Sequence, residues 1–210
     1  MKKRTWIAGG LGVLALGAAA AGWAQYRSIE TPDFDEIAAD GDFSVREYAP
    51  MVVAEVTHTG DRSKSLNAGF RRLAAYIFAE DRPGTKIAMT APVMQDQHQE
   101  IAMTAPVLQD GGEGAGGWRT RFVMPADYTM ETLPQPPSDI TLTEVPRRRI
   151  AAISFSGSAT SKDLAEKEEA LRAWMAARKL IAAGPVEYAF YDAPMVPPQV
   201  RRNEVMIPVE

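Results

Sequence analysis

The sequence contains two segments with the same order of elements, and this internal repeat limits the folds that the chain can adopt. Residues 43–60 read FSVREYAPMVVAEVTHTG, and residues 140–158 read ITLTEVPRRRIAAISFSGS. In each segment a short stretch typical of a β-strand is followed by a proline and then by a second, more apolar stretch. Each segment therefore predicts two strands separated by a proline-marked break.

A helix is predicted after each pair of strands. Within residues 63–84, SKSLNAGFRRLAAYIFAEDRPG, apolar side chains recur at helical spacing, Ser63 is a suitable cap, and Pro83-Gly84 ends the pattern. The second helix, within residues 160–185, is expected to be capped by Thr160, with acidic residues early and basic residues late.

A shift of 97 positions superimposes the two halves, and it pairs Glu47 with Glu144 and Ala54 with Ala151. More strand-like sequence follows each helix. The pattern predicts an α+β fold of two pseudo-duplicated β-β-α-β-β units, which form an antiparallel sheet or a distorted antiparallel β-barrel flanked by two helices.

The first 24 residues form a separate segment. Three basic residues precede a charge-free run of 19 residues from Trp6 to Ala24, close to the roughly 20 that span a bilayer. We expect residues 1–24 to be a membrane anchor or a cleaved signal peptide, residues 25–40 a tether, and residues 41–210 the folded domain. Either form of the segment places the domain at a bacterial cell envelope, facing the periplasm.

Charge and cysteine content limit the kinds of partner and of metal site that we expect for this protein. The formal net charge is −4, and removal of residues 1–24 with their three positive charges makes it −7. An acidic domain without a basic stripe argues against nucleic acid as a partner. The absence of cysteine excludes disulfides and thiolate metal sites. The sequence leaves the oligomeric state open.

The heptapeptide IAMTAPV occurs twice, at residues 87–93 and 101–107. Strand alternation places Ile, Met, Ala and Val of each copy on one face. If the copies fold into a hairpin centred near Gln97, Met89 and Met103 lie within about 8 Å of each other. We expect both methionines to pack in an apolar layer, although a thioether can also ligate heme iron.

Few residues are candidates for chemistry. The sequence contains no recognisable catalytic motif, which argues against an enzyme. The candidate metal ligands are His58, His98, Met89 and Met103, and for His58 a core or rim position is the alternative interpretation. Arginine pairs near the first helix and near the C-terminus can receive carboxylates or can simply be solvated; they are Arg71, Arg72, Arg201 and Arg202.

Four motifs together resemble the SOUL heme-binding family. They are KIAMTAPV, FVMPADYTMETLP, EVPRRRIAAISFSG and YDAPMVPPQVRRNEV, which occur in this order. The resemblance covers about residues 30 to 210. It implies a distorted antiparallel β-barrel like that of GyrI-type small-molecule-binding domains. It also implies non-covalent binding of heme or another tetrapyrrole in an apolar groove beside the first helix, without a universal axial ligand.

Positions matched to the family suggest the residues of that groove. They are Leu66, Phe70, Arg71, Arg72 and Leu73 of the first helix, with Met195 and Arg201 of the C-terminal motif. None of the matched motifs contains a histidine. The second IAMTAPV is additional to the minimal family pattern, and the N-terminal segment is additional to the soluble members.

Two other functions are compatible with the sequence. A GyrI-like small-molecule-binding protein or hydrolase would use a buried carboxylate with a raised pKa, and Glu187, Tyr188 and Tyr191 are the residues to inspect. An interaction module would instead bind a partner through the proline-rich residues Pro134 to Pro137, with a vestigial pocket.

Overall fold

The computed structural model describes residues 29–98, 117–192 and 196–210. The chain divides into the units Met1–Glu30 and Thr31–Glu210, and the elements below belong to the second. In chain order these are β1 (Phe34–Asp40), β2 (Phe43–Tyr48), β3 (Met51–His58), α2 (Arg62–Ile77), β4 (Val93–His98), β5 (Gly117–Val123), β6 (Thr141–Val145), β7 (Arg148–Ser156), α3 (Ser161–Ala177), β8 (Glu187–Phe190), the short 3₁₀ helix η1 (Pro198–Val200) and β9 (Arg202–Val209).

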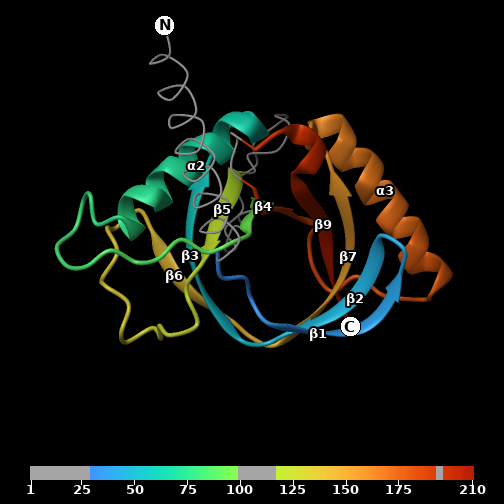
Figure 1. Ribbon diagram of the computed structural model, residues 1–210, viewed down its shortest axis with the longest axis horizontal. Helices are drawn as coiled ribbons and strands as arrows, with labels where there is room; N and C mark the ends of the chain where they lie inside the picture. The colour runs from blue at the N-terminus through green and yellow to red at the C-terminus, as the bar shows by residue number, and fades with distance from the viewer. Residues whose placement is uncertain (1–28, 99–116, 193–195) are drawn as a thin grey trace, which may run out of the picture. The chain divides into compact units, whose positions relative to one another are not determined.

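The strands of the described residues form one curled, fully antiparallel sheet in the order β1-β2-β7-β9-β8-β4-β5-β3-β6 (Figure 1). The predicted repeat is present, because the 97-residue shift carries β2 onto β6 and β3 onto β7. The two strands on either side of each proline do not pair with each other. Instead β2 pairs with β7, and β6 pairs with β3, so each half contributes a strand to the other.

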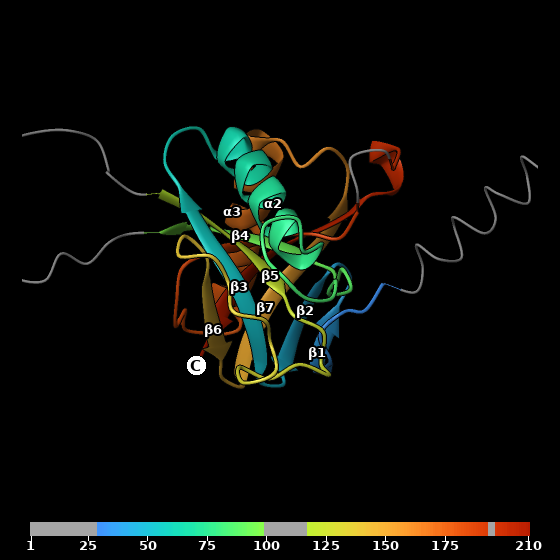
Figure 2. The same ribbon diagram turned by 90° about the vertical axis from the view of Figure 1, so that its left-hand side faces the viewer.

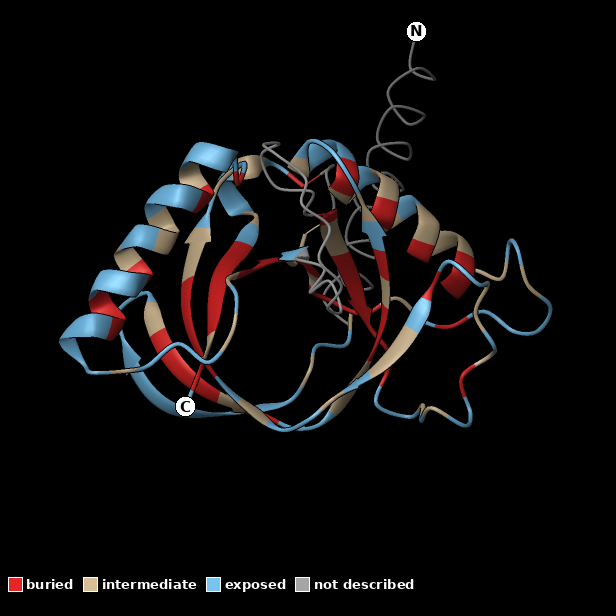
Figure 3. Cartoon of the chain, turned by 180° about the vertical axis from the view of Figure 1, so that it is seen from behind, coloured by how far each residue is buried: buried red, intermediate tan, exposed pale blue. Residues whose placement is uncertain are grey.

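Both helices lie on the same face of the sheet. α2 packs on β3 and β5, and α3 packs in the equivalent place on β7 and β9, as Figures 1 and 2 show. Their outer sides are exposed, whereas their sheet-facing sides are buried (Figure 3). The α+β fold predicted from the sequence, with two helices on a curled antiparallel sheet, is therefore confirmed.

The helix cap predicted from the sequence is confirmed for α3 but is wrong for α2. Thr160 caps α3, and its hydroxyl accepts a hydrogen bond from the backbone N–H of Asp163 while the Asp163 carboxylate accepts from that of Thr160. The cap of α2 is Asp61 rather than Ser63, because the Asp61 carboxylate accepts from the backbone N–H of Lys64 at 3.0 Å. Ser63 lies in the first turn of the helix.

The described part of the predicted tether is not a tether. Residues 34–40 form the edge strand β1, which pairs with β2. The centroids of the Phe34 and Tyr48 rings are 5.2 Å apart. The guanidinium carbon of Arg46 lies 4.7 Å from the centroid of the Phe34 ring. Every residue of β1 is exposed, so the strand lacks the apolar alternation by which a sequence reveals a strand.

The strand and hairpin predicted for the heptapeptide are wrong in the described copy, although Met89 packs against an apolar cluster as expected. Residues 85–89 have no regular structure, and β4 begins only at Val93. Pro92 has no N–H to donate to a ladder, and the ladder starts at the next residue. β4 runs through Gln97 and pairs on both sides, with β5 and β8, so Gln97 is not the centre of a hairpin.

Other predictions concern residues outside the described ranges. The second IAMTAPV, with Met103, belongs to residues 99–116, and the membrane segment belongs to residues 1–28. The spacing of Met89 and Met103 therefore stays a prediction. Among the helices in the described ranges, none is long and apolar enough to cross a membrane.

The inner face of the sheet, opposite the helices, combines an apolar cluster with buried charges. Val53, Ile150 and Met206 belong to the cluster. Beside it, a row of ion pairs crosses strands β3, β5, β4, β8 and β7, which we call the inner charge row. It consists of Glu55, Arg119, Asp96, Arg121, Glu187 and Arg148.

A further buried carboxylate on the inner face, Glu204, has its own set of partners outside the inner charge row. The side chain of Glu204 is fully buried and accepts hydrogen bonds from Arg46 at 2.9 Å, Arg202 at 2.8 Å and Tyr191 at 2.7 Å. Burial alone would raise the pKa of Glu204, but Arg46 and Arg202 outweigh it and hold that pKa below its usual range. The carboxylate is therefore ionised at neutral pH.

α2 lies close to the sheet at Gly69. A Cβ built at this position would lie 2.4 Å from the Thr120 hydroxyl oxygen and 2.6 Å from Thr120 Cβ. Glycine therefore determines how closely α2 packs on β5.

We predict that Gly69→Ala destabilises the protein by about 1–3 kcal/mol, as overpacking does, although alanine is normally the better helix residue. Urea unfolding measures this. In a Thr120→Gly background the same substitution should cost much less, because the clashing atoms are gone. Equal costs in both backgrounds would contradict the clash.

We predict that Glu204→Gln lowers the free energy of unfolding at pH 7 by about 3–5 kcal/mol, because two arginines lose their charged partner. A carboxylate with a depressed pKa stabilises the fold above its unfolded pKa, near 4.5, and loses this effect as pH falls through the folded pKa. The gap between variant and wild type should thus narrow below about pH 4.5. Glu166→Gln, at an exposed site, is the control, and a pH-independent gap would contradict the linkage.

Candidate functional site

The groove residues predicted on α2 divide into two groups. Leu73 is fully buried in the apolar cluster beneath the helix, so it cannot contact a ligand. Leu66 and Phe70 are only half-buried. The ring of Phe70 packs edge-on against Phe122 of β5 at a centroid distance of 5.3 Å. The flank of α2 that presents Leu66 and Phe70 is therefore the part available for binding, and we call it the α2 flank.

The two arginines of α2 differ in availability. The Arg72 guanidinium binds Asp139 through two nitrogens, at 2.5 and 2.7 Å, and Asp81 at 2.5 Å. Its bond to Asp139 raises the pKa of Arg72 and lowers the pKa of Asp139. Arg71 is exposed and has no ion pair with any described residue. Arg71, rather than Arg72, is thus free to meet a ligand carboxylate.

The C-terminal motif is described only in part. Met195 lies outside the described ranges. Arg201 follows η1, and its Nε donates to the backbone oxygen of Val196 at 2.7 Å. This bond folds Arg201 back onto the segment before η1. A contact between this segment and α2, which the family resemblance implies, stays a prediction.

The two histidines come to the same end of the sheet. His58 ends β3 opposite Trp118 of β5, and the backbone of His98 ends β4 opposite Gly117. Nδ1 of His58 is buried and has no hydrogen-bond partner in the described part of the chain. Met89 is half-buried against the cluster under α2. The described residues contain no group of three His, Cys, Asp or Glu side chains that could hold a metal.

The three residues proposed for a hydrolase do not include a carboxylate with a raised pKa. Burial would raise the pKa of Glu187, but Arg121 and Arg148 hold that pKa below its usual range. Burial and the nearby Glu168 raise the pKa of Tyr188 to about 12. Tyr191 donates its hydroxyl to Glu204, and burial beside that carboxylate also raises the pKa of Tyr191. A buried carboxylate with a raised pKa, which the hydrolase hypothesis required, is thus not found at Glu187.

The proline-rich connection is anchored to the domain rather than projecting from it. The Tyr76 hydroxyl donates to the backbone oxygen of Pro134 at 2.6 Å. Leu133 and Ile140, on either side of the prolines, are buried in the cluster under α2. The segment therefore packs against α2 and its apolar cluster as part of the folded domain.

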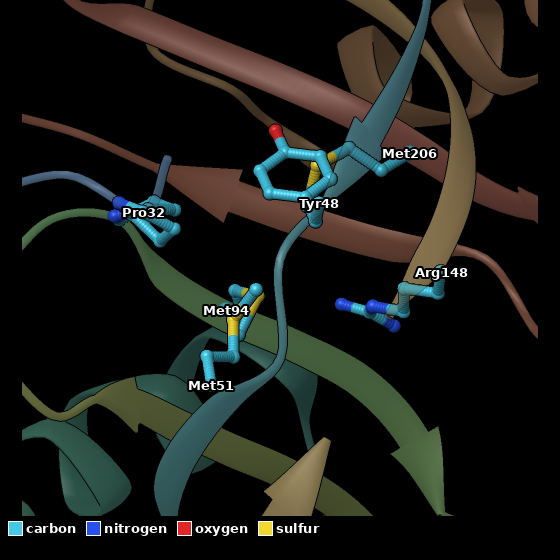
Figure 4. Close-up of a pocket in the computed structure, with 7 residues that line it drawn as sticks. Pro32, Tyr48, Met51, Met94, Arg148 and Met206 are labelled. Carbon is cyan, nitrogen blue, oxygen red and sulfur yellow. The ribbon is translucent and has the colours of Figure 1, made fainter. Parts of the chain in front are cut away.

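A pocket on the inner face was not predicted from the sequence. It has a cavity volume of about 10 Å³, is partly open to solvent, and is lined by Pro32, Tyr48, Met51, Pro92, Met94, Arg148 and Met206 (Figure 4). The three methionines come from β3, β4 and β9. They are distant in sequence, so no linear motif reveals that they converge.

Comparison with solved structures shows the fold. An uncharacterized conserved protein from Listeria innocua is 13% identical over 82% of this chain and 94% of its own, with a TM-score of 0.57. The C-terminal domain of EcmrR is also 13% identical, over 80% and 96% of the two chains, with a TM-score of 0.58. A hydrolase from Listeria innocua is 12% identical over 83% and 94%, with a TM-score of 0.54.

Comparison at the level of sequence gives the family. No curated protein matches the chain. The model of the SOUL heme-binding protein family matches residues 29–208, which include both described helices and every described strand except the last residue of β9, Val209. The chain belongs to the SOUL heme-binding protein family.

Proposed function

We propose that this protein binds heme or a related tetrapyrrole non-covalently on the α2 flank. The family match over residues 29–208 is the observation that carries the proposal. The α2 flank supports it, because it combines half-buried apolar side chains with an arginine that has no described partner.

The chemistry of the α2 flank fits the ligand. A tetrapyrrole has wide apolar faces and, in heme, two propionates at one edge. Leu66 and Phe70 can cover part of a face, and completing the burial of each half-buried side chain contributes roughly 1 kcal/mol, compared with about 1.5–3 kcal/mol for full burial from water. Arg71 can pair with a propionate, and a charge-assisted hydrogen bond contributes about 1.5–3 kcal/mol. Arg72 acts indirectly, since its ties to Asp139 and Asp81 hold the helix against the connections around it.

The inner pocket is a poorer candidate for the same ligand. Its cavity volume of about 10 Å³ is far below the roughly 300–1,000 Å³ of sites that enclose drug-sized ligands, and a porphyrin is larger than such ligands. An open surface such as the α2 flank therefore suits a tetrapyrrole better than this pocket.

The cellular location of the protein is a further part of the proposal. The charge-free run from Trp6 to Ala24 supports a bacterial envelope location, with the domain facing the periplasm. Fractionation should place the protein in the membrane if the run is retained, and an intact mass lacking about residues 1–24 would indicate cleavage. Recovery of the uncleaved chain in the cytosol would contradict this location. That the chain does not bind nucleic acid also stays a prediction.

We predict that hemin titrated into the purified full-length protein gives a saturable Soret shift. Arg71→Glu should weaken binding roughly tenfold or more, because a charge-assisted contact becomes a repulsion. Lys162→Glu is the matched control, since it makes the same charge change at an exposed position of α3.

A second pair of variants tests the apolar part of the same site. Leu66→Gln should weaken hemin binding, whereas Ile181→Gln, at an apolar side chain that is 61% exposed elsewhere, should leave it unchanged. Absence of a saturable shift would overturn the proposed function. Saturable binding that neither Leu66→Gln nor Arg71→Glu affects would place the ligand elsewhere.

A further inference from the structure

The inner pocket is a small opening to solvent in which three methionine side chains converge (Figure 4). Met94 and Met206 are buried, with 3% of each residue exposed, and Met51 is half-buried. Met94 and Met206 belong to the apolar cluster of the inner face, and Met51 packs against it. The cavity volume of about 10 Å³ leaves room for about one water molecule. A very small molecule, or a single added atom, is therefore what fits there.

Two methionines in other parts of the core are buried to nearly the same extent. Met124 and Met175 each have 4% of the residue exposed, and they belong to the clusters beneath α2 and α3. Neither of them lines the inner pocket. Protein interiors contain few voids as large as a water molecule. Met94 and Met206 thus differ from Met124 and Met175 in lying beside an opening to solvent, and not in their overall burial.

Methionine supplies all the side-chain sulfur of this protein, because the chain has no cysteine. A thioether is oxidised to a sulfoxide by peroxides. A lone pair of the sulfur attacks one oxygen of hydrogen peroxide, and the O–O bond breaks. That oxygen stays on the sulfur, and the other leaves as water with both protons. The sulfur loses two electrons and the peroxide gains them, so the reaction needs no other reactant.

The inner pocket is also suited to the product of this reaction. A sulfoxide in a close-packed core is disruptive, because it adds a polar atom where no space is left. Here the added oxygen can occupy the room of the one water molecule. That oxygen carries a partial negative charge, and the positively charged guanidinium of Arg148 is part of the lining. Figure 4 shows this guanidinium directed toward the space between Met94 and Tyr48.

We propose that the inner pocket is a methionine oxidation site, in which hydrogen peroxide converts the thioether of Met94 or Met206 to a sulfoxide whose oxygen occupies the pocket. Met51, the least buried of the three methionines, controls the entry of the oxidant. Each sulfoxide formed consumes one molecule of peroxide. The oxidation site lies on the face of the sheet opposite α2, and it does not depend on the proposed binding of a tetrapyrrole.

The experiment exposes the folded full-length protein to hydrogen peroxide and follows the oxidation of each methionine over time by peptide mass spectrometry. Met94 and Met206 should each gain an oxygen atom roughly tenfold or more faster than Met124 and Met175, because oxidation follows the access of the oxidant to the sulfur. Met130 is half-buried in the connection between β5 and β6. Its oxidation should be fast, which shows that the oxidant is active.

Two substitutions at Met51 test the route of the oxidant. Met51→Ala opens the pocket and should raise the oxidation rates of the two buried pocket methionines, whereas the bulkier and stiffer Met51→Phe should lower them. Neither substitution should change the rates of the two methionines beneath the helices. Met130→Ala is the matched control, since it removes a half-buried methionine that does not line the pocket, and it should leave all four rates unchanged.

The proposal is overturned if Met94 and Met206 of the wild type are oxidised no faster than Met124 and Met175, because oxidation then requires unfolding rather than the pocket. It is also overturned if the folded Met51 variants leave the rates of the pocket methionines unchanged. If neither variant folds, the comparison within the wild-type protein still decides the point. The oxidation is measured without added hemin, so its result is separate from that of the hemin titration.

Discussion

The backbone pairing of β2 with β7 and of β3 with β6 is the constraint on which the rest of this structure depends. Each half of the repeat gives its first strand to the other half, so neither half has a complete sheet by itself. The pairing of β4 with β8 closes the middle of the sheet between the halves. These three strand pairings join the two halves into one curled sheet with a continuous inner face. The pocket shows this, since its wall takes Met94 from the first half and Met206 from the second.

Charges on the inner face are tolerated because they compensate each other. Moving a carboxylate or guanidinium out of water costs several kcal/mol, and the attraction between partners offsets this only with good geometry. Asp96 meets Arg119 through two hydrogen bonds, and Glu187 meets Arg148 in the same way. Together with the other pairs of the inner charge row, they connect the neighbouring strands β3, β5, β4 and β8 with the more distant β7. They therefore favour one strand register over others, in which like charges would face each other.

The sequence predicted the repeat well, because the shift of 97 residues reflects local patterns that each half carries within itself. The Thr160 cap was predictable for the same reason. The site was less predictable, since its decisive contacts join distant residues. Arg72 seemed free until the fold brought Asp139 to it, and the methionines of the pocket lie on strands whose neighbours no local pattern reveals. β1 was missed because its exposed side chains do not alternate, and its pairing with β2 alone makes it a strand.

The two edge strands, β1 and β6, are poorly suited to pair with the sheet of a second copy of the chain. An unpaired strand edge can template the addition of another strand, and natural sheets counter this with charge, irregularity or brevity. β1 carries Asp35, Glu36 and Asp40 and has a register irregularity between Glu36 and Ala38. β6, at the opposite edge, has only five residues. A second chain approaching β1 would meet like charge and a broken ladder, and at β6 it would gain few hydrogen bonds. The same sheet that is continuous enough to hold a pocket is thus poorly suited to polymerise.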